Sequence, residues 1–137
     1  MNEEATSQDL RPPLLMSEED NNRLSSLAGA IAKRSPLVAR LLAEEVDRAD
    51  VVPAGQVTAG TVAIGSFVEY RDATTGEERR FQVVLPPEAD FAEGRISILS
   101  LVGAGLIGMS EGQSIDWPAG DGRLRRLTVL RVAPPPE

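Results

Sequence analysis

The chain has 137 residues, 42% of them hydrophobic, which suits one packed domain or a small domain with an appendage. Its formal net charge of −7 argues against broad electrostatic binding to nucleic acid or to an anionic membrane, because both require a basic face. Cysteine and histidine are absent, which excludes disulfides, thiolate zinc sites, cysteine nucleophiles and histidine general bases.

Residues 1–16 are expected to form a flexible leader, because they carry charges and the sequence RPP without periodicity. The first ten residues, MNEEATSQDL, are acidic and polar, unlike a secretory signal peptide. No apolar run approaches the length of a membrane span. We therefore expect a cytoplasmic protein that has no membrane partner.

Residues 17–50 are predicted to form an antiparallel helical hairpin, a short coiled coil. Ser17 is placed to cap the first helix, whose apolar face consists of Leu24, Leu27, Ala28 and Ile31. Pro36 suits the first position of a second helix, with Ser35 as its cap. The apolar stripe of that helix consists of Val38, Leu41, Leu42, Val46 and Ala49. The hairpin tip is then formed by Lys33, Arg34, Ser35 and Pro36.

Beyond the connector VVPAGQVTAG the hydrophobic pattern changes to the period of two that is typical of strands. Residues 61–72 and 77–85 are predicted to pair around the turn ATTG, and residues 95–99 form a third strand. A closing hairpin joins residues 114–117 to residues 123–132 through the turn PAGDG.

Residues 51–133 are therefore expected to form a mainly antiparallel β domain with one short helix near residues 102–109. Residues 134–137 form a tail. Together with the helical hairpin, this domain gives an α+β fold.

The sequence SLVGAGLIGMSEG contains the pattern G-x-G-x-x-G, formed by Gly103, Gly105 and Gly108, directly after a predicted strand. A dinucleotide-binding loop requires a full helix after these glycines, and a crossover back to a parallel strand takes a dozen or more residues. Here the breaker sequence SEGQS begins two residues after Gly108, and another strand follows at once. No nucleotide site is predicted.

The acidic residues near the end of the second predicted helix do not indicate a metal site. They spread around the helix and interleave with Arg48, which is typical of a solvated face. These residues are Glu44, Glu45, Asp47 and Asp50. We predict no catalytic residue, no metal ligand and no cofactor.

The densest basic spots are Arg79 with Arg80, and Arg123 with Arg125 and Arg126. No aromatic residues interleave with these arginines, so we expect weak or no direct binding of nucleic acid. The aromatic residues fall mainly within strand runs, and core packing is the favoured interpretation for them. They are Phe67, Tyr70, Phe81, Phe91 and Trp117.

The sequence from GSFV onward resembles the C-terminal domain of the Gre transcript-cleavage factors, and more closely the Rnk branch of that family, the regulators of nucleoside diphosphate kinase. The matching segments occur in family order over roughly residues 50–133: GSFV, TGEE, EAD, GRISILS, VGAGLIG, GQSIDWP and DG. The resemblance implies an FKBP-like C-terminal domain after a short N-terminal coiled coil. It also implies binding to bacterial RNA polymerase at its secondary channel. The three glycines then serve as tight-turn and close-packing positions beside a short helix.

Two departures from the family pattern concern function. Leu101 replaces the proline of the Ser-Pro loop that faces the polymerase, and we expect the contact loop to comprise Ser100, Leu101, Val102 and Gly103. On the residues alone Leu101 could equally pack inward, but the resemblance favours the contact. At the hairpin tip, Lys33 and Arg34 stand where Gre factors carry the carboxylates that help to hold a catalytic metal ion.

The sequence therefore favours a non-enzymatic, monomeric regulator that binds the polymerase, competes with Gre factors and does not promote transcript cleavage. A prolyl isomerase is a second possibility, because FKBP-like folds include such enzymes, but it requires a concave aromatic pocket. A third is an adaptor that regulates nucleoside diphosphate kinase.

Overall fold

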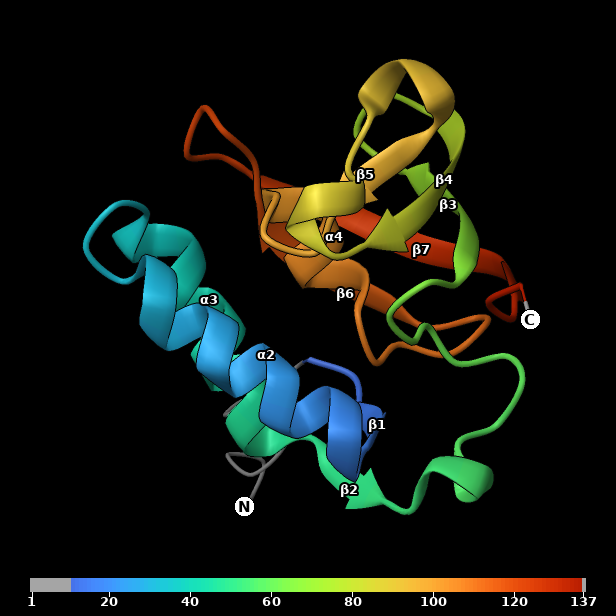
Figure 1. Cartoon of the computed structure of the whole chain (residues 1–137). Helices are drawn as coiled ribbons and strands as arrows, with labels where there is room; N and C mark the ends of the chain where they lie inside the picture. The colour runs from blue at the N-terminus through green and yellow to red at the C-terminus, as the bar shows by residue number, and fades with distance from the viewer. Residues whose placement is uncertain (1–10, 137) are drawn as a thin grey trace, which may run out of the picture.

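The protein was analysed as a computed structural model, which describes residues 11–136. Its helical hairpin lies beside a curled β-sheet, with the tip loop of the hairpin at the far left of the view (Figure 1). The predicted α+β class is confirmed.

The hairpin consists of α2, Glu18–Ile31, and α3, Pro36–Arg48. Ser17 caps α2 by accepting a hydrogen bond from the backbone N–H of Asp20 at 3.0 Å. The side chain of Asn21, near the start of α2, donates to the carbonyl of Val46, near the end of α3. This bond shows that the helices run antiparallel, as predicted. Ser35 occupies the cap position of α3, but its side chain makes no capping hydrogen bond.

The predicted leader is wrong at its C-terminal end, and its first ten residues lie outside the described chain. Strand β1, Leu15–Ser17, pairs in parallel with β2, Asp50–Val52. Leu14 and Met16 alternate with Leu15, so both point into the core, where they are 2% and 3% exposed. The backbone N–H of Leu15 donates to the carbonyl of Gly108. The segment therefore ties the base of the hairpin to the sheet domain.

The second sheet contains five strands in the order β5-β4-β3-β7-β6. Their bounds are Phe67–Asp72 for β3, Glu77–Val84 for β4, Arg95–Ser97 for β5, Ser114–Pro118 for β6 and Leu124–Ala133 for β7. Neighbouring strands are antiparallel except for β4 and β5, which are parallel.

The domain is mainly antiparallel, as predicted, and the parallel pair of β4 and β5 is the exception. Between β4 and β5 the chain forms two 3-10 helices, η2 at Pro86–Glu88 and η3 at Phe91–Glu93. This connection carries the chain back to Gln82, so that β5 runs parallel to the last three residues of β4. The predicted strand 61–72 is also shorter than expected. Only its second half belongs to β3, because residues 61–66 form turns and a single bridge from Thr61 to Ser110. A third short 3-10 helix, η1, spans Ala54–Gln56.

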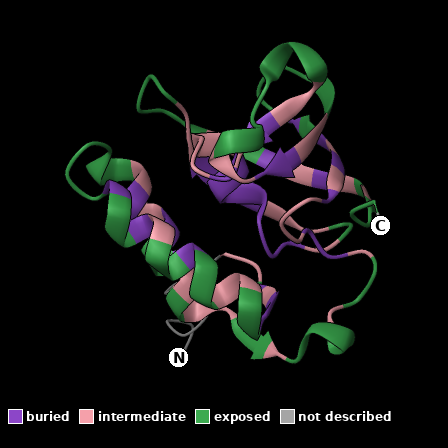
Figure 2. Ribbon diagram, in the orientation of Figure 1, coloured by how far each residue is buried: buried purple, intermediate pink, exposed green. Residues whose placement is uncertain are grey.

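The short helix α4, Leu101–Leu106, packs against the sheet and closes the core. Figure 2 shows buried residues concentrated at this contact and along the facing sides of α2 and α3. A Cβ on Gly103 would collide with the carbonyl oxygen of Ser97, and one on Gly105 would lie 2.7 Å from Nε1 of Trp117. Gly108 has a φ of +83°, which L side chains rarely adopt. The expected close-packing and turn roles of these glycines are confirmed.

Among residues 11–136, no helix has both the length and the apolar character needed to cross a membrane.

Candidate functional site

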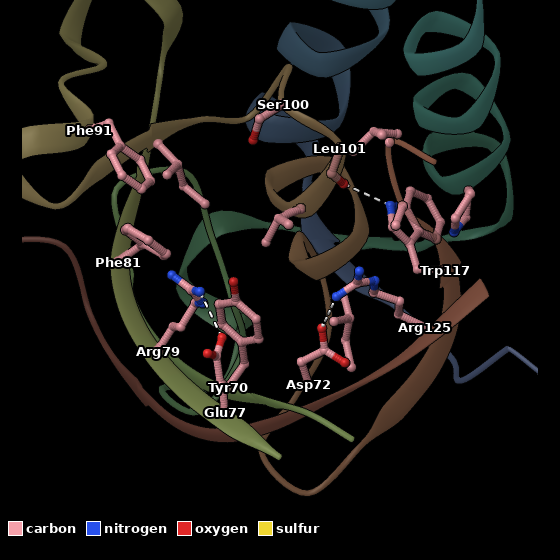
Figure 3. A pocket seen from close by; sticks show the side chains of 16 residues that line it. Tyr70, Asp72, Glu77, Arg79, Phe81, Phe91, Ser100, Leu101, Trp117 and Arg125 are labelled. Atoms are coloured by element: carbon pink, nitrogen blue, oxygen red, sulfur yellow. Dashed lines mark hydrogen bonds and ion pairs between the residues drawn. The ribbon is translucent and has the colours of Figure 1, made fainter. Parts of the chain in front are cut away.

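A cleft of about 470 Å³ opens between α4, the β3–β4 hairpin and the β6–β7 hairpin (Figure 3). Its lining includes four of the five aromatic side chains of the protein, contributed by four separate elements. They are Tyr70 on β3, Phe81 on β4, Phe91 on η3 and Trp117 on β6. A concave, largely apolar site with a few converging polar groups is the usual form of a ligand-binding site.

The aromatic residues form the walls of the cleft. The rings of Phe81 and Phe91 lie 5.4 Å apart and those of Tyr70 and Phe81 lie 6.5 Å apart, both within the range of aromatic pairing. On the opposite side, the indole N–H of Trp117 donates to the carbonyl of Leu101 at 2.7 Å. Tyr70 and Trp117 are buried, as expected of core residues, but Phe91 is 69% exposed. The favoured interpretation as core residues is therefore wrong at Phe91, and Phe67 is only partly buried.

Two ion pairs balance the charges of the lining. Arg125 donates to Asp72 at 2.9 Å, and Arg79 donates to Glu77 at 2.7 Å. Burial alone would raise the pKa of Asp72. The hydrogen bonds from Arg125 and from the backbone of Thr74 outweigh it, so the pKa lies below the ordinary value of 3.8. The cleft therefore carries charged groups of both signs and little net charge.

Three of the five arginines in the basic spots of the sequence pair with carboxylates. Besides the two arginines of the cleft, Arg126 pairs with Asp116 at 3.1 Å. Arg80 lies over the ring of Phe67, 5.8 Å from its centroid.

The expected solvated acidic face is wrong at Glu45. This side chain is 1% exposed and lies between Arg48 and Arg11, whose nitrogens approach its carboxylate oxygens to 2.7 Å and 3.1 Å. The guanidinium of Arg48 also donates to the carbonyl of Pro12. Glu45 is buried because residues 11–14 cross this face of α3, which the helix pattern alone does not reveal. Glu44, Asp47 and Asp50 are exposed as expected. Among residues 11–136, no three or more acidic side chains gather as a metal site would require.

The expected contact loop is the first turn of α4 rather than a loop. Ser100 caps this helix, because its hydroxyl donates to the carbonyl of Ser97 and accepts from the backbone N–H of Gly103. Leu101 and Val102 are half-buried, and Gly103 is buried. One wall of the cleft is lined by Ser100, Leu101 and Val102. Three of the four predicted contact residues therefore lie in the same cleft as the aromatic residues.

The second predicted site is the hairpin tip, which lies at the end of the hairpin that is far from β1 and β2. Lys33, Arg34, Ser35 and Pro36 are all exposed. The sequence contains no acidic residue from position 21 to position 43, so the whole tip half of the hairpin lacks carboxylates.

Sequence reasoning did not identify the cleft, although one signal for it was present. Along β3 the side chains alternate, so Tyr70 and Asp72 point to the same face. The missing information was the position of η3 and of the β6–β7 hairpin, which bring Phe91 and Arg125 to that face from distant parts of the chain.

Two family models match the chain, and the boundary between them lies at the base of the hairpin. The family model for the C-terminal domain of the transcription elongation factors GreA and GreB matches residues 56–134, and the model for the Rnk N-terminus matches residues 12–52. The regulator of nucleoside diphosphate kinase of Escherichia coli K12 is 29% identical over 127 residues, which is 93% of each chain.

Transcription elongation factor GreA of Brucella canis is 40% identical over 91 residues, covering 66% of this chain and 58% of that protein. Among solved structures, the elongation factor GreA/GreB from Nitrosomonas europaea superposes with a TM-score of 0.69 at 29% identity. That match covers 90% of this chain and all of the other.

Proposed function

The chain belongs to the GreA/GreB family of transcription elongation factors, in its Rnk branch, and we propose that it is a non-enzymatic regulator of transcription elongation. It binds bacterial RNA polymerase near the secondary channel and competes there with Gre-type factors. Because it carries no carboxylates at the tip of its hairpin, it does this without promoting transcript cleavage.

The observation that carries this proposal is the charge of the hairpin. Lys33 and Arg34 are exposed at the tip, and the charged residues between positions 21 and 43 are all basic. Hard divalent cations take anionic oxygen ligands, which this surface does not offer. A factor of this kind can occupy the channel entrance and cannot supply ligands to a metal ion inside it.

The length of the hairpin is consistent with a role at the entrance. Helix α2 has 14 residues, and at a rise of about 1.5 Å per residue it extends roughly 21 Å. The start of α4, with the proposed contact residues Leu101 and Val102 and their cap Ser100, supplies the second contact with the polymerase.

Binding to purified polymerase from the host, measured by surface plasmon resonance, tests the proposal. We expect saturable binding that an excess of a Gre factor from the same host abolishes. Saturable binding that persists at saturating Gre factor contradicts the shared site, and no binding contradicts the proposal as a whole.

The name of the relative from E. coli, a regulator of nucleoside diphosphate kinase, favours a second candidate function, in which the protein is an adaptor for that kinase. Isolation of the tagged protein from its own host, followed by identification of the bound proteins, distinguishes the kinase from the polymerase.

The FKBP-like domain implied by the resemblance also suggests a prolyl isomerase. Core packing of the aromatic residues would leave no aromatic pocket for such an enzyme, but four of these residues meet at the cleft. A peptide isomerisation assay tests this alternative. We expect no acceleration, because the relatives are named as regulators or elongation factors.

A further inference from the structure

A groove of about 410 Å³ runs along the tip half of the helical hairpin, between α2 and α3. Its lining carries one charged side chain, that of Arg40, and is otherwise mainly apolar. It includes Ala28, Gly29 and Ala32 from α2 and Ala39, Arg40 and Ala43 from α3. Four of these six residues are exposed, so no other element of the described chain, residues 11–136, covers the groove.

The groove lies in a basic part of an acidic protein. The chain has a formal net charge of −7, but its charged residues between positions 21 and 43 are all basic: Arg23, Lys33, Arg34 and Arg40. Arg23 lies 3.8 Å from Glu19. The other three are exposed, and no carboxylate among residues 11–136 forms an ion pair with them. The groove therefore combines an apolar floor with positive charge that the described chain does not neutralise.

The described chain begins near this groove. Arg48 donates to the carbonyl of Pro12, and Arg11, one residue earlier, lies 3.7 Å from Glu44. From Pro12 back to Arg11 the contacts therefore move along α3 by one turn toward the hairpin tip. Glu44 is in turn one helical turn from Arg40, which lines the groove. The residues that precede Arg11 are thus attached within reach of the groove.

Those ten residues have the charge and the length that the groove requires. Their sequence, MNEEATSQDL, contains no Lys or Arg and three acidic residues, which are Glu3, Glu4 and Asp9. An extended chain of ten residues spans up to roughly 33 Å. The groove extends only about 10 Å along α3, from Ala43 to Pro36. The segment is therefore long enough to cross α3 and to lie along the whole groove.

Two other occupants fit the groove less well. A second copy of the chain would present the same basic groove, so that like charges would face each other across the twofold axis. A nucleic acid has the opposite charge, but the lining contains no aromatic ring on which its bases could stack. An acidic segment that is covalently attached beside the groove also has a high effective concentration there.

We propose that residues 1–10 bind in this groove and that their carboxylates pair with Lys33, Arg34 and Arg40. The protein then screens the basic half of its own hairpin, and a partner that binds there has to displace the segment. This inference goes beyond the proposed regulation of transcription and does not rest on it. Its test contains no polymerase, so a failure of polymerase binding leaves the result unaffected.

The test measures the distance of the segment from the groove by NMR. Because the chain has no cysteine, a cysteine introduced as Ser7→Cys carries a nitroxide label at one site of the full chain. The reference is the same labelled chain in which Glu3→Gln, Glu4→Gln and Asp9→Asn remove the three charges. At low salt we expect severalfold greater paramagnetic broadening of the Gly29 and Ala32 amides in the acidic chain than in the reference.

Salt separates the two labelled chains further. At 1 M salt the screening length falls to about 3 Å, so the difference between them should disappear. Equal broadening in both chains at low salt, or no broadening of the groove amides in either, overturns the proposal.

Two substitutions in the groove complete the test. Gly29→Leu fills the groove without a collision, because nothing lies within 4 Å of a Cβ at this exposed position. We expect it to reduce the broadening of Ala32 severalfold while the melting temperature stays at or above that of the parent, since Leu favours the helix. Arg40→Gln should also reduce the broadening. Arg71→Gln, which removes an arginine paired with Glu78 on the sheet, is the control and should leave it unchanged. Undiminished broadening in Gly29→Leu overturns the proposal.

Discussion

The indole of Trp117 lies so close to Gly105 that a Cβ at this glycine would come within 2.7 Å of the indole nitrogen. The ring cannot swing away without cost, because its N–H donates to the carbonyl of Leu101. This contact holds α4 against β6. It thereby fixes the position of the first turn of α4, which contains the residues proposed to contact the polymerase.

We predict that Gly105→Ala lowers the free energy of unfolding by about 2 kcal/mol, the usual cost of forcing an extra methyl group into a packed site. Urea denaturation measures this change. Gly29→Ala is the matched control, because Gly29 is exposed on α2 with nothing within 4 Å of the added Cβ. That variant should gain roughly 0.5–1 kcal/mol from helix propensity. Equal effects of the two substitutions would show that the indole contact is unimportant.

A second prediction concerns the buried carboxylate beneath the N-terminal segment. Glu45→Gln leaves Arg48, whose side chain is 15% exposed, without its carboxylate partner, and we expect a loss of about 3 kcal/mol. Glu44→Gln is the control. Glu44 lies 3.7 Å from Arg11 but is 49% exposed, so its loss should cost less than about 0.5 kcal/mol. Chemical denaturation of both variants checks the difference, and similar losses would mean that Glu45 does not hold this segment.

A third prediction follows from Asp72, whose pKa in the folded protein lies below 3.8 because of its bonds to Arg125 and Thr74. A lowered carboxyl pKa contributes stability above the pKa of the unfolded chain, and this stability is lost as the pH falls through the folded value. Asp72→Asn should therefore be less stable than the parent at pH 7, and the difference should shrink below about pH 4. Urea titrations from pH 7 to pH 3 measure this. A difference that widens in acid would contradict the assigned direction of the shift.

A fourth prediction tests the first turn of α4 as a polymerase contact. Leu101→Asp places a charge on a half-buried apolar residue that lies at the start of the helix, where acidic residues are tolerated. We expect a folded protein, verified by circular dichroism, with at least about tenfold weaker binding to the polymerase. Val51→Asp, a similar change at an exposed residue of β2, should bind normally. A folded Leu101→Asp variant with normal affinity would place the contact elsewhere.

The fold was most predictable where a local pattern decides the structure. The hairpin followed from helical spacing, from Ser17 and from Pro36. The lack of room for a full helix excluded a nucleotide site at Gly103, Gly105 and Gly108, and the family resemblance implied their turn and packing roles. The parallel pairing of β5 was not predictable, because it depends on the path of the chain through η2 and η3. Strand β1 was missed because its three residues gain their partners only from β2, far along the chain.

The candidate site also combines features that could be predicted from the sequence with features that depend on the tertiary fold. The positions of Ser100 and Leu101 were identified from the family resemblance, but we expected a loop there, whereas Ser100 caps a helix that begins at Leu101. The aromatic cleft could not be predicted, because Phe91 and Trp117 lie on separate elements whose approach is decided by the tertiary fold. Burial of Glu45 likewise depends on Arg11, 34 positions away.

The last prediction concerns the hairpin tip: the protein should not stimulate transcript cleavage in backtracked polymerase complexes. Such assistance requires carboxylates that hold a divalent cation near the scissile phosphate and position the attacking water. Lys33 and Arg34 offer no such ligand and repel the ion. The nearest acid on α3, Glu44, is eight residues beyond Pro36, about 12 Å back along the helix axis. The protein should instead suppress cleavage by a Gre factor as its concentration rises, because both occupy one entrance. Gel analysis of the cleaved transcripts measures both effects: cleavage by this protein alone would refute the role of the tip, and undiminished Gre-dependent cleavage at saturating protein would refute competition.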